Sequence, residues 1–309
     1  MKDKEEKGKG KGEGEKGKEE EKVSAFSLQP LAFPLRLSQG NLNLLSTCPR
    51  KFQHIYIEQL AAPNPPEQQE KLIQGNRFHL LMQQWQLGLS IEPFIQEDAQ
   101  LQRWFTAFAN AAPTILGMES DDGTVLGQSE HTRTLEFEGY LLTVVYDLLL
   151  SNPQQAKILD WKTYARPQNP RWLLENWQTR LYPFVLVETS DYLPEQISMT
   201  YWFFQAQAEQ ATTPEAQSFA IAYNSTKHEQ TRQVLSHLLT QLTHWLERYQ
   251  QGEPFPHLPV RSKPCETCNF TLRCFGLEDW QQNSSEPPQI ETSNLSLLSL
   301  EEIQEVPLN

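Results

Sequence analysis

The residues best suited to chemistry lie in the stretch "AKILDWKTYARP", residues 156–167, which places Asp160 and Lys162 two positions apart. If this stretch is a β-strand, its side chains alternate between the two faces, so the carboxylate and the ammonium stand side by side. Asp147 lies 13 residues earlier in an otherwise apolar stretch. A hairpin between the two stretches would bring Asp147 back beside Asp160.

Two interpretations fit this arrangement. In the first, Lys162 only neutralises a buried carboxylate, because an uncompensated charge in the interior is costly. In the second, Asp147 and Asp160 share a divalent cation such as Mg²⁺ or Mn²⁺, which prefers oxygen ligands. Lys162 would then orient an attacking water or stabilise charge on a phosphate, as phosphodiester hydrolysis requires.

Two helical spacings favour the metal interpretation. His79 follows Gly75 by four positions, so both lie on one helical face and the glycine leaves room beside the imidazole. Gln178 and Tyr182 are also four apart, which puts an amide and a phenol on one face of a later helix. Taken singly, each has a plainer explanation, since a lone histidine is more often structural and a Gln–Tyr pair can lie on a solvated surface. Together, and in this order, they indicate a site.

The four cysteines form a second pattern. Cys265, Cys268 and Cys274 follow a C-x2-C-x5-C spacing, and Cys48 lies 217 residues before the first of them. Four thiolates are suitable ligands for an iron–sulfur cluster or for zinc. The chain lacks the two short CxxC pairs of a typical zinc ribbon, but spacing alone does not separate the two occupants.

Composition limits the class of protein. With 38% apolar and 21% charged residues among 309, the chain is expected to form a globular body. Its formal net charge of −13 argues against coating nucleic acid by bulk charge, although it is compatible with a local basic groove. The sequence shows neither a secretion signal nor a membrane-spanning run, so a soluble cytoplasmic protein without disulfides is expected.

Both ends are expected to lie outside the folded body. Residues 1–22 hold 8 lysines and 8 acidic residues with almost no apolar side chain, a composition typical of disorder. Residues 281–309 are rich in Ser, Glu and Pro, and we interpret them as a low-complexity tail. One folded domain is therefore predicted over residues 23–280.

The elements that must position these groups follow from periodicity and turn signals. Helical patterns precede and follow three strands, of which the middle one is almost wholly apolar, as expected for a strand buried on both faces. Pro113 is expected to close the third helix and Pro183 to kink the fourth. The order predicts an α/β fold with helices packed on a mixed sheet. The expected helices span residues 37–60 with a break near Pro49, 65–88, 93–113, 170–188 and 225–252, and the expected strands span 124–137, 139–151, 154–163, 196–207 and 217–224.

Four motifs, in their order along the chain, resemble those of the PD-(D/E)XK nuclease superfamily and specifically its RecB/AddB-like branch. The match covers most of residues 38–276. The short "DWK" motif is weak alone, whereas the ordered set of four is far more specific. The resemblance implies a restriction-endonuclease-like core with a mixed central β-sheet flanked by helices. The motifs are "GNRFH" (75–79), "VVYD" (144–147), "DWK" (160–162) and "QTRLY" (178–182).

The resemblance also implies roles for individual residues at a catalytic Mg²⁺ or Mn²⁺. Lys162 would assist the nucleophilic water. The side chains around it would be metal ligands that hold the ion against a phosphate. By resemblance, the expected ligands are His79, Asp147, Asp160 and the backbone carbonyl of Trp161.

Other residues are expected to shape the site against DNA. Gln178 and Tyr182 would line it, and Glu130 is a weaker candidate for an accessory acidic role. One residue departs from the family pattern, because Val144 stands where the family often has glycine, three positions before the first aspartate. That side chain would narrow the space for the substrate backbone.

The same branch includes members in which one cysteine before the nuclease core and three after it hold a [4Fe–4S] cluster. By this resemblance, Cys48, Cys265, Cys268 and Cys274 are expected to hold iron–sulfur, with zinc as the less favoured occupant. Such a cluster would join the N- and C-terminal segments as a staple, and nothing indicates redox catalysis.

Cations flank the cysteines and would converge wherever the cysteines meet. On an otherwise acidic protein they could form an entrance that tracks the phosphates of DNA beside the cluster. The plainer alternative is that they only solvate the site. The five are Arg50, Lys51, Arg261, Lys263 and Arg273.

The expected activity is metal-dependent hydrolysis of DNA, exonuclease-like on single-stranded DNA or DNA ends, in repair or recombination. The sequence contains no helicase P-loop of the form GxxxxGK[ST], so a strand-opening motor would be a helicase or other repair protein acting in trans. Two alternatives stay open: a catalytically silent DNA-binding or scaffold module of the same fold, and a zinc-stapled interaction protein. Neither cleavage polarity nor oligomeric state follows from the sequence.

Overall fold

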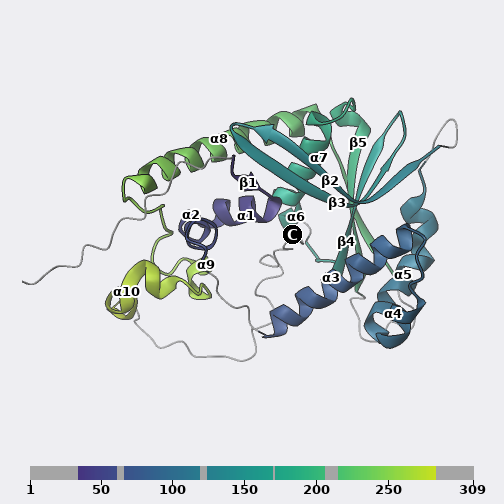
Figure 1. Cartoon of the computed structure of the whole chain (residues 1–309), viewed down its shortest axis with the longest axis horizontal. Helices are drawn as coiled ribbons and strands as arrows, with labels where there is room; N and C mark the ends of the chain where they lie inside the picture. The colour runs from purple at the N-terminus through teal and green to yellow at the C-terminus, as the bar shows by residue number, and fades with distance from the viewer. Residues whose placement is uncertain (1–33, 61–65, 119–123, 170, 206–214, 283–309) are drawn as a thin grey trace, which may run out of the picture. The chain divides into compact units, whose positions relative to one another are not determined.

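The protein is described by a computed structural model that covers residues 34–60, 66–118, 124–169, 171–205 and 215–282. Its framework is a six-stranded sheet with helices on both faces (Figure 1). The strands are β1 (Arg36–Leu37), β2 (Leu126–Phe137), β3 (Tyr140–Ser151), β4 (Ala156–Ala165), β5 (Ile197–Gln205) and β6 (Gln217–Ala222). Five of the strands, β2 to β6, agree with the predicted ones to within a few residues, whereas β1 was not predicted and overlaps the start of the first predicted helix.

The helices follow the predicted order, with more breaks than expected. The first segment divides at Cys48 and Pro49 as predicted, and it continues into a π-helix, η1 (Gln53–Ile57), that was not expected. The helices are α1 (Gln39–Thr47), α2 (Pro49–Phe52), α3 (Pro66–Gln86), α4 (Glu92–Glu97), α5 (Ala99–Leu116), α6 (Arg171–Glu175), α7 (Trp177–Glu188), α8 (Ser225–Gln250), α9 (Lys263–Glu266) and α10 (Thr271–Gln282), with a short 3₁₀ turn, η2 (Pro194–Gln196).

Strand β3 is the hub of the sheet. β2 pairs with it antiparallel along one side. The other side is shared by β1, which is parallel to the start of β3, and β4, which is antiparallel to its end. β4 then pairs parallel with β5, and β5 antiparallel with β6. These mixed directions confirm the predicted α/β fold with a mixed central sheet.

Two hydrophobic cores cover the two faces of the sheet. Figure 1 shows α7 and α8 on one side of the strands and α3, α4 and α5 on the other. The first core includes Ile158 of β4 packed with residues of α1, α7 and α8. The second includes Leu159 and Trp161 of β4 packed with Phe78 of α3 and Phe108 of α5. β4 is therefore buried on both faces, and its side chains alternate as predicted.

Two predicted helices are each split by a capping residue. The helix predicted over 93–113 is α4 followed by α5, because the Asp98 side chain accepts hydrogen bonds from the first backbone N–H groups of α5 and so caps it. The prediction that Pro113 ends this helix was wrong, since α5 continues to Leu116. The helix predicted over 170–188 breaks at Asn176, which caps α7 in the same way, while Pro183 lies inside α7.

The prediction of a disordered tail over residues 1–22 lies outside the described residues. Of the tail predicted over residues 281–309, the first two residues instead end α10, and the remainder lies outside the described residues. Among the residues that the structure describes, no helix combines the length and the apolarity that a membrane span requires.

Candidate functional site

Asp147 lies where the β3–β4 hairpin opens. The described pairing of these strands runs from Ser151 and Ala156 to Leu148 and Leu159. Beyond this pairing, the Asp147 side chain bonds to the backbone of β4: its Oδ2 accepts a 2.6 Å hydrogen bond from the Trp161 N–H. A charged acceptor on a backbone donor is a strong contact, so the carboxylate is held firmly beside β4.

A strained residue of β2 faces Asp147. β2 and β3 keep the same register on both sides of Glu130, which places Glu130 opposite Asp147. Its φ is 49°, a left-handed conformation that is uncommon for a residue with a side chain. Such backbone strain is concentrated at functional sites. The strained position thus falls at the point where β2 and β3 present two carboxylates.

His79, Glu130 and Asp147 form a compact group of potential metal ligands, the one such group among the described residues. Each offers one ligand atom, and these atoms all lie within 4.8 Å of one another. The His79 Nδ1 is 3.2 Å from Asp147 Oδ1. The His79 side chain is 18% exposed and that of Asp147 8%, so the group opens to solvent on the histidine side. One nitrogen and two carboxylates suit Mn²⁺ or Mg²⁺.

His79 reaches this group from α3, whose neighbouring Phe78 anchors the helix in the second core. Gly75 lies one turn earlier on the same helix. The sequence predicted that this glycine leaves room beside the imidazole, but a Cβ placed there would meet the hydroxyl of Thr163 on β4 at 3.5 Å, an ordinary contact. Gly75 thus lies against β4, and the structure gives the imidazole no need of the glycine.

Asp160 and Lys162 form a second polar group, on the α7 face of the sheet. They are 1% and 6% exposed, and Lys162 Nζ lies 2.7 Å from Asp160 Oδ1. Gln178 closes the triangle, because its Nε2 donates to Asp160 Oδ2 at 2.6 Å and its Oε1 accepts from Lys162 Nζ at 3.1 Å. Both oxygens of the Asp160 carboxylate are therefore engaged inside the protein.

Tyr201 of β5 supports this triangle from the neighbouring strand. It is the register partner of Asp160, and Lys162 Nζ lies 5.5 Å from the centre of its ring. Burial and the Asp160 charge raise the pKa of Tyr201 well above its ordinary value, while Lys162 acts in the opposite direction. Tyr201 is therefore a neutral phenol. Its hydroxyl oxygen forms a hydrogen bond with the Thr179 hydroxyl, and the two oxygens are 2.7 Å apart.

Gln178 is positioned by the capped start of α7. The Asn176 side chain accepts from the Gln178 backbone N–H at 2.8 Å. Asn43 of α1 braces the same turn, since its amide donates to the Asn176 side chain at 3.0 Å and its oxygen accepts from the Trp177 N–H at 3.0 Å. Helix α1 therefore fixes the helix end that carries Gln178, a dependence that the sequence alone did not reveal.

Tyr182 and Val144 lie in the first hydrophobic core. The Tyr182 ring packs edge-on against Tyr146 with ring centres 5.4 Å apart, and it is 3% exposed. Val144 is 1% exposed in the same core. Alternation along β3 turns Val144 toward α7 together with Leu142 and Tyr146, and the expectation that it narrows the space for substrate stays a prediction.

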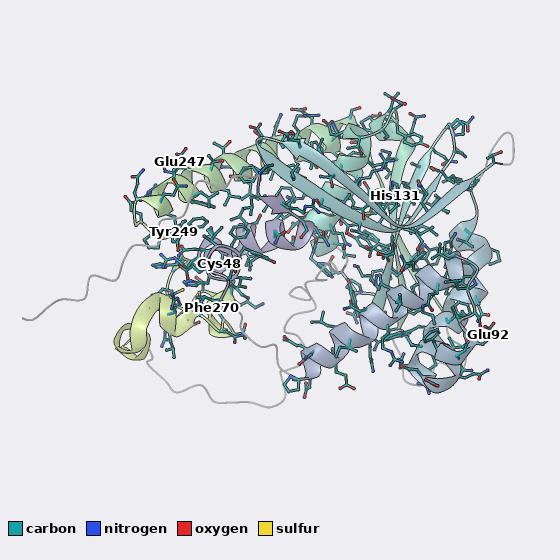
Figure 2. All side chains as sticks on the ribbon, in the orientation of Figure 1. Cys48, Glu92, His131, Glu247, Tyr249 and Phe270 are labelled. Atoms are coloured by element: carbon teal, nitrogen blue, oxygen red, sulfur yellow. The ribbon has the colours of Figure 1, made fainter. Side chains whose placement is uncertain are left out.

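The four cysteines carry no disulfide and converge from two distant segments. Cys48 follows α1, and Figure 2 marks it near Tyr249 and Phe270 at the end of the protein where α9 and α10 lie. Burial raises the pKa of the Cys265 thiol, and the charges of Cys48 and Cys268 raise it further.

The Cys274 thiol shows the same convergence. Burial raises its pKa to about 11, with Arg50 acting against this and the other three cysteines adding to it. Thiolates that oppose one another's ionisation in this way are stabilised when a metal centre supplies positive charge between them. The four side chains therefore fit a metal centre, whose site is built from both ends of the folded body.

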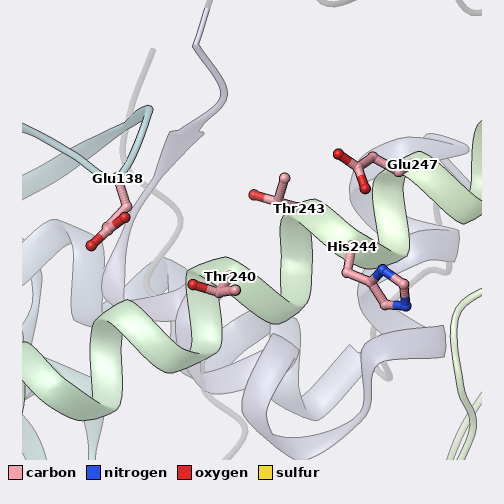
Figure 3. Close-up of a pocket in the computed structure, with 5 residues that line it drawn as sticks. All are labelled: Glu138, Thr240, Thr243, His244 and Glu247. Carbon is pink, nitrogen blue, oxygen red and sulfur yellow. The ribbon is translucent and has the colours of Figure 1, made fainter.

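A separate surface pocket lies between α8 and the turn that joins β2 to β3 (Figure 3). It has a volume of about 440 Å³ and is lined by Glu138, Thr240, Thr243, His244 and Glu247. Glu138 accepts a hydrogen bond from Ser236 of α8, so this carboxylate has a structural partner. The lining includes no member of the polar groups described above.

Two of three comparisons with known proteins found a match. Residues 36–275 match the family described as "PD-(D/E)XK nuclease superfamily". A solved structure from Eubacterium rectale, described as a "Putative exonuclease", is 13% identical, with 85% of this chain and 94% of that chain covered and a TM-score of 0.48. The search of curated proteins found no match. Because the family match spans more than half of the sequence, this chain belongs to the PD-(D/E)XK nuclease superfamily.

Proposed function

We propose that this protein is a divalent-metal-dependent deoxyribonuclease that hydrolyses phosphodiester bonds, exonuclease-like on single-stranded DNA or DNA ends. The observation that carries the proposal is the adjacency of two polar groups on neighbouring strands. The ligand group of His79, Glu130 and Asp147 is joined to the Asp160–Lys162 pair by the hydrogen bond from Trp161 to Asp147. A structural salt bridge would need only the pair and would leave the ligand group unexplained.

The residues divide the work of hydrolysis among them. A divalent ion, when bound, would lower the pKa of a water ligand and neutralise charge on the phosphate. Asp147 is held by the Trp161 N–H through one oxygen, so its other oxygen is presented without rearrangement. Lys162 places a positive charge in a water-poor site, where it stabilises developing negative charge strongly. The proposed ion ligands are His79, Glu130, Asp147, Asp160 and the backbone carbonyl of Trp161.

Glu130 has a larger role in this proposal than the sequence predicted. It belongs to the ligand group at the solvent side, while the two oxygens of Asp160 are already bound by Lys162 and Gln178. His79 and Glu130 are the less buried members of the ligand group, so they would be the first residues open to an ion. Glu130 would capture the ion, and Asp160 would complete its coordination.

We expect Glu130→Gln to weaken Mn²⁺ binding by about 10-fold, because the amide keeps the shape of the ligand and loses its charge. Titration of DNA cleavage and of Mn²⁺ electron paramagnetic resonance against metal concentration would measure the change. Glu136→Gln on the same strand, outside the ligand group, is the matched control. Equal metal affinity for Glu130→Gln and wild type would remove Glu130 from the ligand set.

We further propose that the cysteines hold a [4Fe–4S] cluster rather than zinc. The C-x2-C-x5-C spacing with one distant cysteine supports this occupant, because the sequence lacks the two short CxxC pairs of a typical zinc ribbon. Brown protein after anaerobic purification would support iron–sulfur, and colourless protein with bound zinc would reject it.

The cations near the cysteines differ in what they contact. Arg50 donates to the Phe255 carbonyl at 2.6 Å and Arg273 lies 3.5 Å from the Glu58 carboxylate, so both support the fold. Arg261 and Lys263 are exposed, and we propose that they contact DNA phosphates. For the double variant Arg261→Gln and Lys263→Gln, we expect weaker DNA binding and a slope of log affinity against log salt that is smaller by about one per cation removed. Fluorescence anisotropy at several salt concentrations would measure both, and an unchanged slope would reject the contact.

Assignment to the RecB/AddB-like branch, a role in repair or recombination and a helicase partner in trans extend this proposal. They are supported by the ordered motifs and by the placement of one cysteine before the nuclease core and three after it. A catalytically silent DNA-binding module of the same fold is the competing function. Folding alone gives no reason to retain buried Asp160 and Lys162 beside a complete ligand group, and this favours the enzyme.

The test is cleavage of end-labelled single- and double-stranded DNA by anaerobically purified protein in Mn²⁺, Mg²⁺ or EDTA. Metal-dependent products shortened one nucleotide at a time from an end would establish an exonuclease and its polarity. Internal fragments would instead establish an endonuclease. A folded, metal-loaded protein that binds DNA and leaves every substrate intact would favour the silent module.

A further inference from the structure

The π-helix η1 places a buried histidine against one of the cysteines. His54 is 3% exposed, and its Nε2 lies 3.7 Å from the sulfur of Cys274. Its ring packs on Phe270 of the cysteine-bearing segment, with ring centres 5.1 Å apart. Short π-helices are rare and occur often at functional sites, because the wider turn redirects the side chains that follow.

The other nitrogen of this histidine is anchored by a carboxylate. Nδ1 lies 2.8 Å from Glu58 Oε2, and Glu58 also accepts from Gln53 Nε2 at 2.5 Å and from the Tyr249 hydroxyl at 3.3 Å. Burial raises the pKa of Glu58, but hydrogen bonds from His54 and Gln53 and the charges of His54 and Arg273 more than offset it, so this pKa lies below its ordinary value. Glu58 is therefore an ionised acceptor, and the proton of this contact is on His54 Nδ1.

We infer that His54 is a positioning residue for Cys274: it holds the sulfur through Nε2 while Glu58 fixes the orientation of the ring. The inference rests on the proposal that the cysteines hold a metal centre. With its Nδ1–H held by Glu58, His54 donates from Nε2 to a bound thiolate when it is the imidazolium, whose charge the Glu58 carboxylate balances. Such outer partners of metal ligands control how tightly the metal is kept and, for iron–sulfur clusters, the reduction potential.

Contacts independent of any metal already join the two cysteine-bearing segments here. The Gln53 side chain accepts from the Phe255 N–H at 2.6 Å, and Arg50 donates to the Phe255 carbonyl at 2.6 Å. Tyr249 at the end of α8 reaches Glu58. The protein therefore sets the distance between His54 and Cys274 itself, and the hydrogen bond does not depend on a cluster to bring its partners together.

The experiment compares His54→Phe and His54→Gln with wild type. Phenylalanine keeps the ring against Phe270 and removes both nitrogens, whereas the Gln amide retains a donor near the position of Nε2. We expect the cluster absorbance of His54→Phe to decay about 10-fold faster in air or with a chelator. Its reduction potential should become more negative, because N–H donors to sulfur favour the reduced, more negative cluster. His54→Gln should restore much of both properties.

Two further variants separate this role from general destabilisation. His257→Phe is the matched control, since His257 is an exposed histidine of the same region. Its ring packs against Phe275, and its Nδ1 lies 2.7 Å from the Leu258 carbonyl. In Glu58→Gln the side-chain oxygen still accepts the hydrogen bond from His54 Nδ1, but the negative charge of the carboxylate is lost. The reduction potential of the cluster should therefore shift in the same direction as in His54→Phe, and by less. Glu58→Gln also provides the test if His54→Phe does not fold.

The outcomes distinguish this inference from the proposal beneath it. Wild-type protein without iron and without zinc would overturn both. If wild type holds zinc, the iron–sulfur proposal fails, and faster zinc release from His54→Phe would still support the positioning role. If wild type holds the cluster while His54→Phe matches it in decay rate and potential, the cluster stands and the role of His54 is overturned.

Discussion

The double variant Asp160→Asn and Lys162→Met is expected to fold like wild type and to cleave DNA at least about 10³-fold more slowly. Both side chains are buried, and the Lys162 ammonium is within 2.7 Å of the carboxylate. Removing Lys162 alone would leave a carboxylate that is 1% exposed without its cation, at a cost of about 3–5 kcal/mol, so lost activity would be confounded with lost stability. Neutralising both partners avoids that cost.

Gln178 is compatible with the neutral pair. Its amide donates to Asp160 and accepts from Lys162 in the wild type, and an asparagine oxygen keeps the first of these bonds. The measurements are the melting temperature and the single-turnover cleavage rate in saturating Mn²⁺. Lys157→Met is the matched control on the same strand, because its exposed ammonium donates to the Gly117 carbonyl at 2.9 Å. A double variant that cuts at the wild-type rate would assign the Asp160–Lys162 pair to structure and contradict the catalytic role.

The sheet and the central pair could be predicted because local signals determine them. The alternation of β4 and the apolar run of β3 require both strands to be buried, and the turn between them forces a hairpin. Once the hairpin is fixed, Asp147 must return beside Asp160. The sequence also predicted that Gln178 and Tyr182 lie on one face of a helix. In the structure Gln178 contacts the Asp160–Lys162 pair, whereas Tyr182 packs in the first hydrophobic core.

The rest depends on contacts between distant segments. Glu130 lies in an ordinary-looking strand sequence, in which no local pattern predicts its left-handed backbone or its place opposite Asp147. The cap at Asp98 is a local signal that was available, since an aspartate before a helical pattern is a typical N-cap. The bracing of α7 by Asn43 joins residues more than a hundred positions apart, which no local pattern reports.

This bracing would connect the proposed metal centre at the cysteines to the proposed active site. Cys48 caps the C-terminal end of α1 through its backbone N–H, and the same short helix carries Asn43, which holds the turn of α7 beneath Gln178. A metal centre held by Cys48 would therefore fix the helix that positions Gln178, a neighbour of the Asp160–Lys162 pair. Its ligands Cys48 and Cys265 are 217 residues apart in the sequence, and such a centre would affect the rate without touching substrate.

The variant Cys48→Ser is accordingly expected to lose the cluster, to melt on the order of 10 °C lower and to cleave more slowly at equal metal loading. The contacts of Arg50 and Gln53 with Phe255 remain, so the segment should stay partly docked and the protein should fold. Thr47→Ser, an exposed neighbour that keeps its hydroxyl, is the control. Iron content, absorbance, melting temperature and Mn²⁺-dependent cleavage would be measured on the same preparations. Loss of colour with unchanged melting and rate would mean that the cluster is no staple, because the polar contacts between the two segments would then suffice to hold α1 against α7.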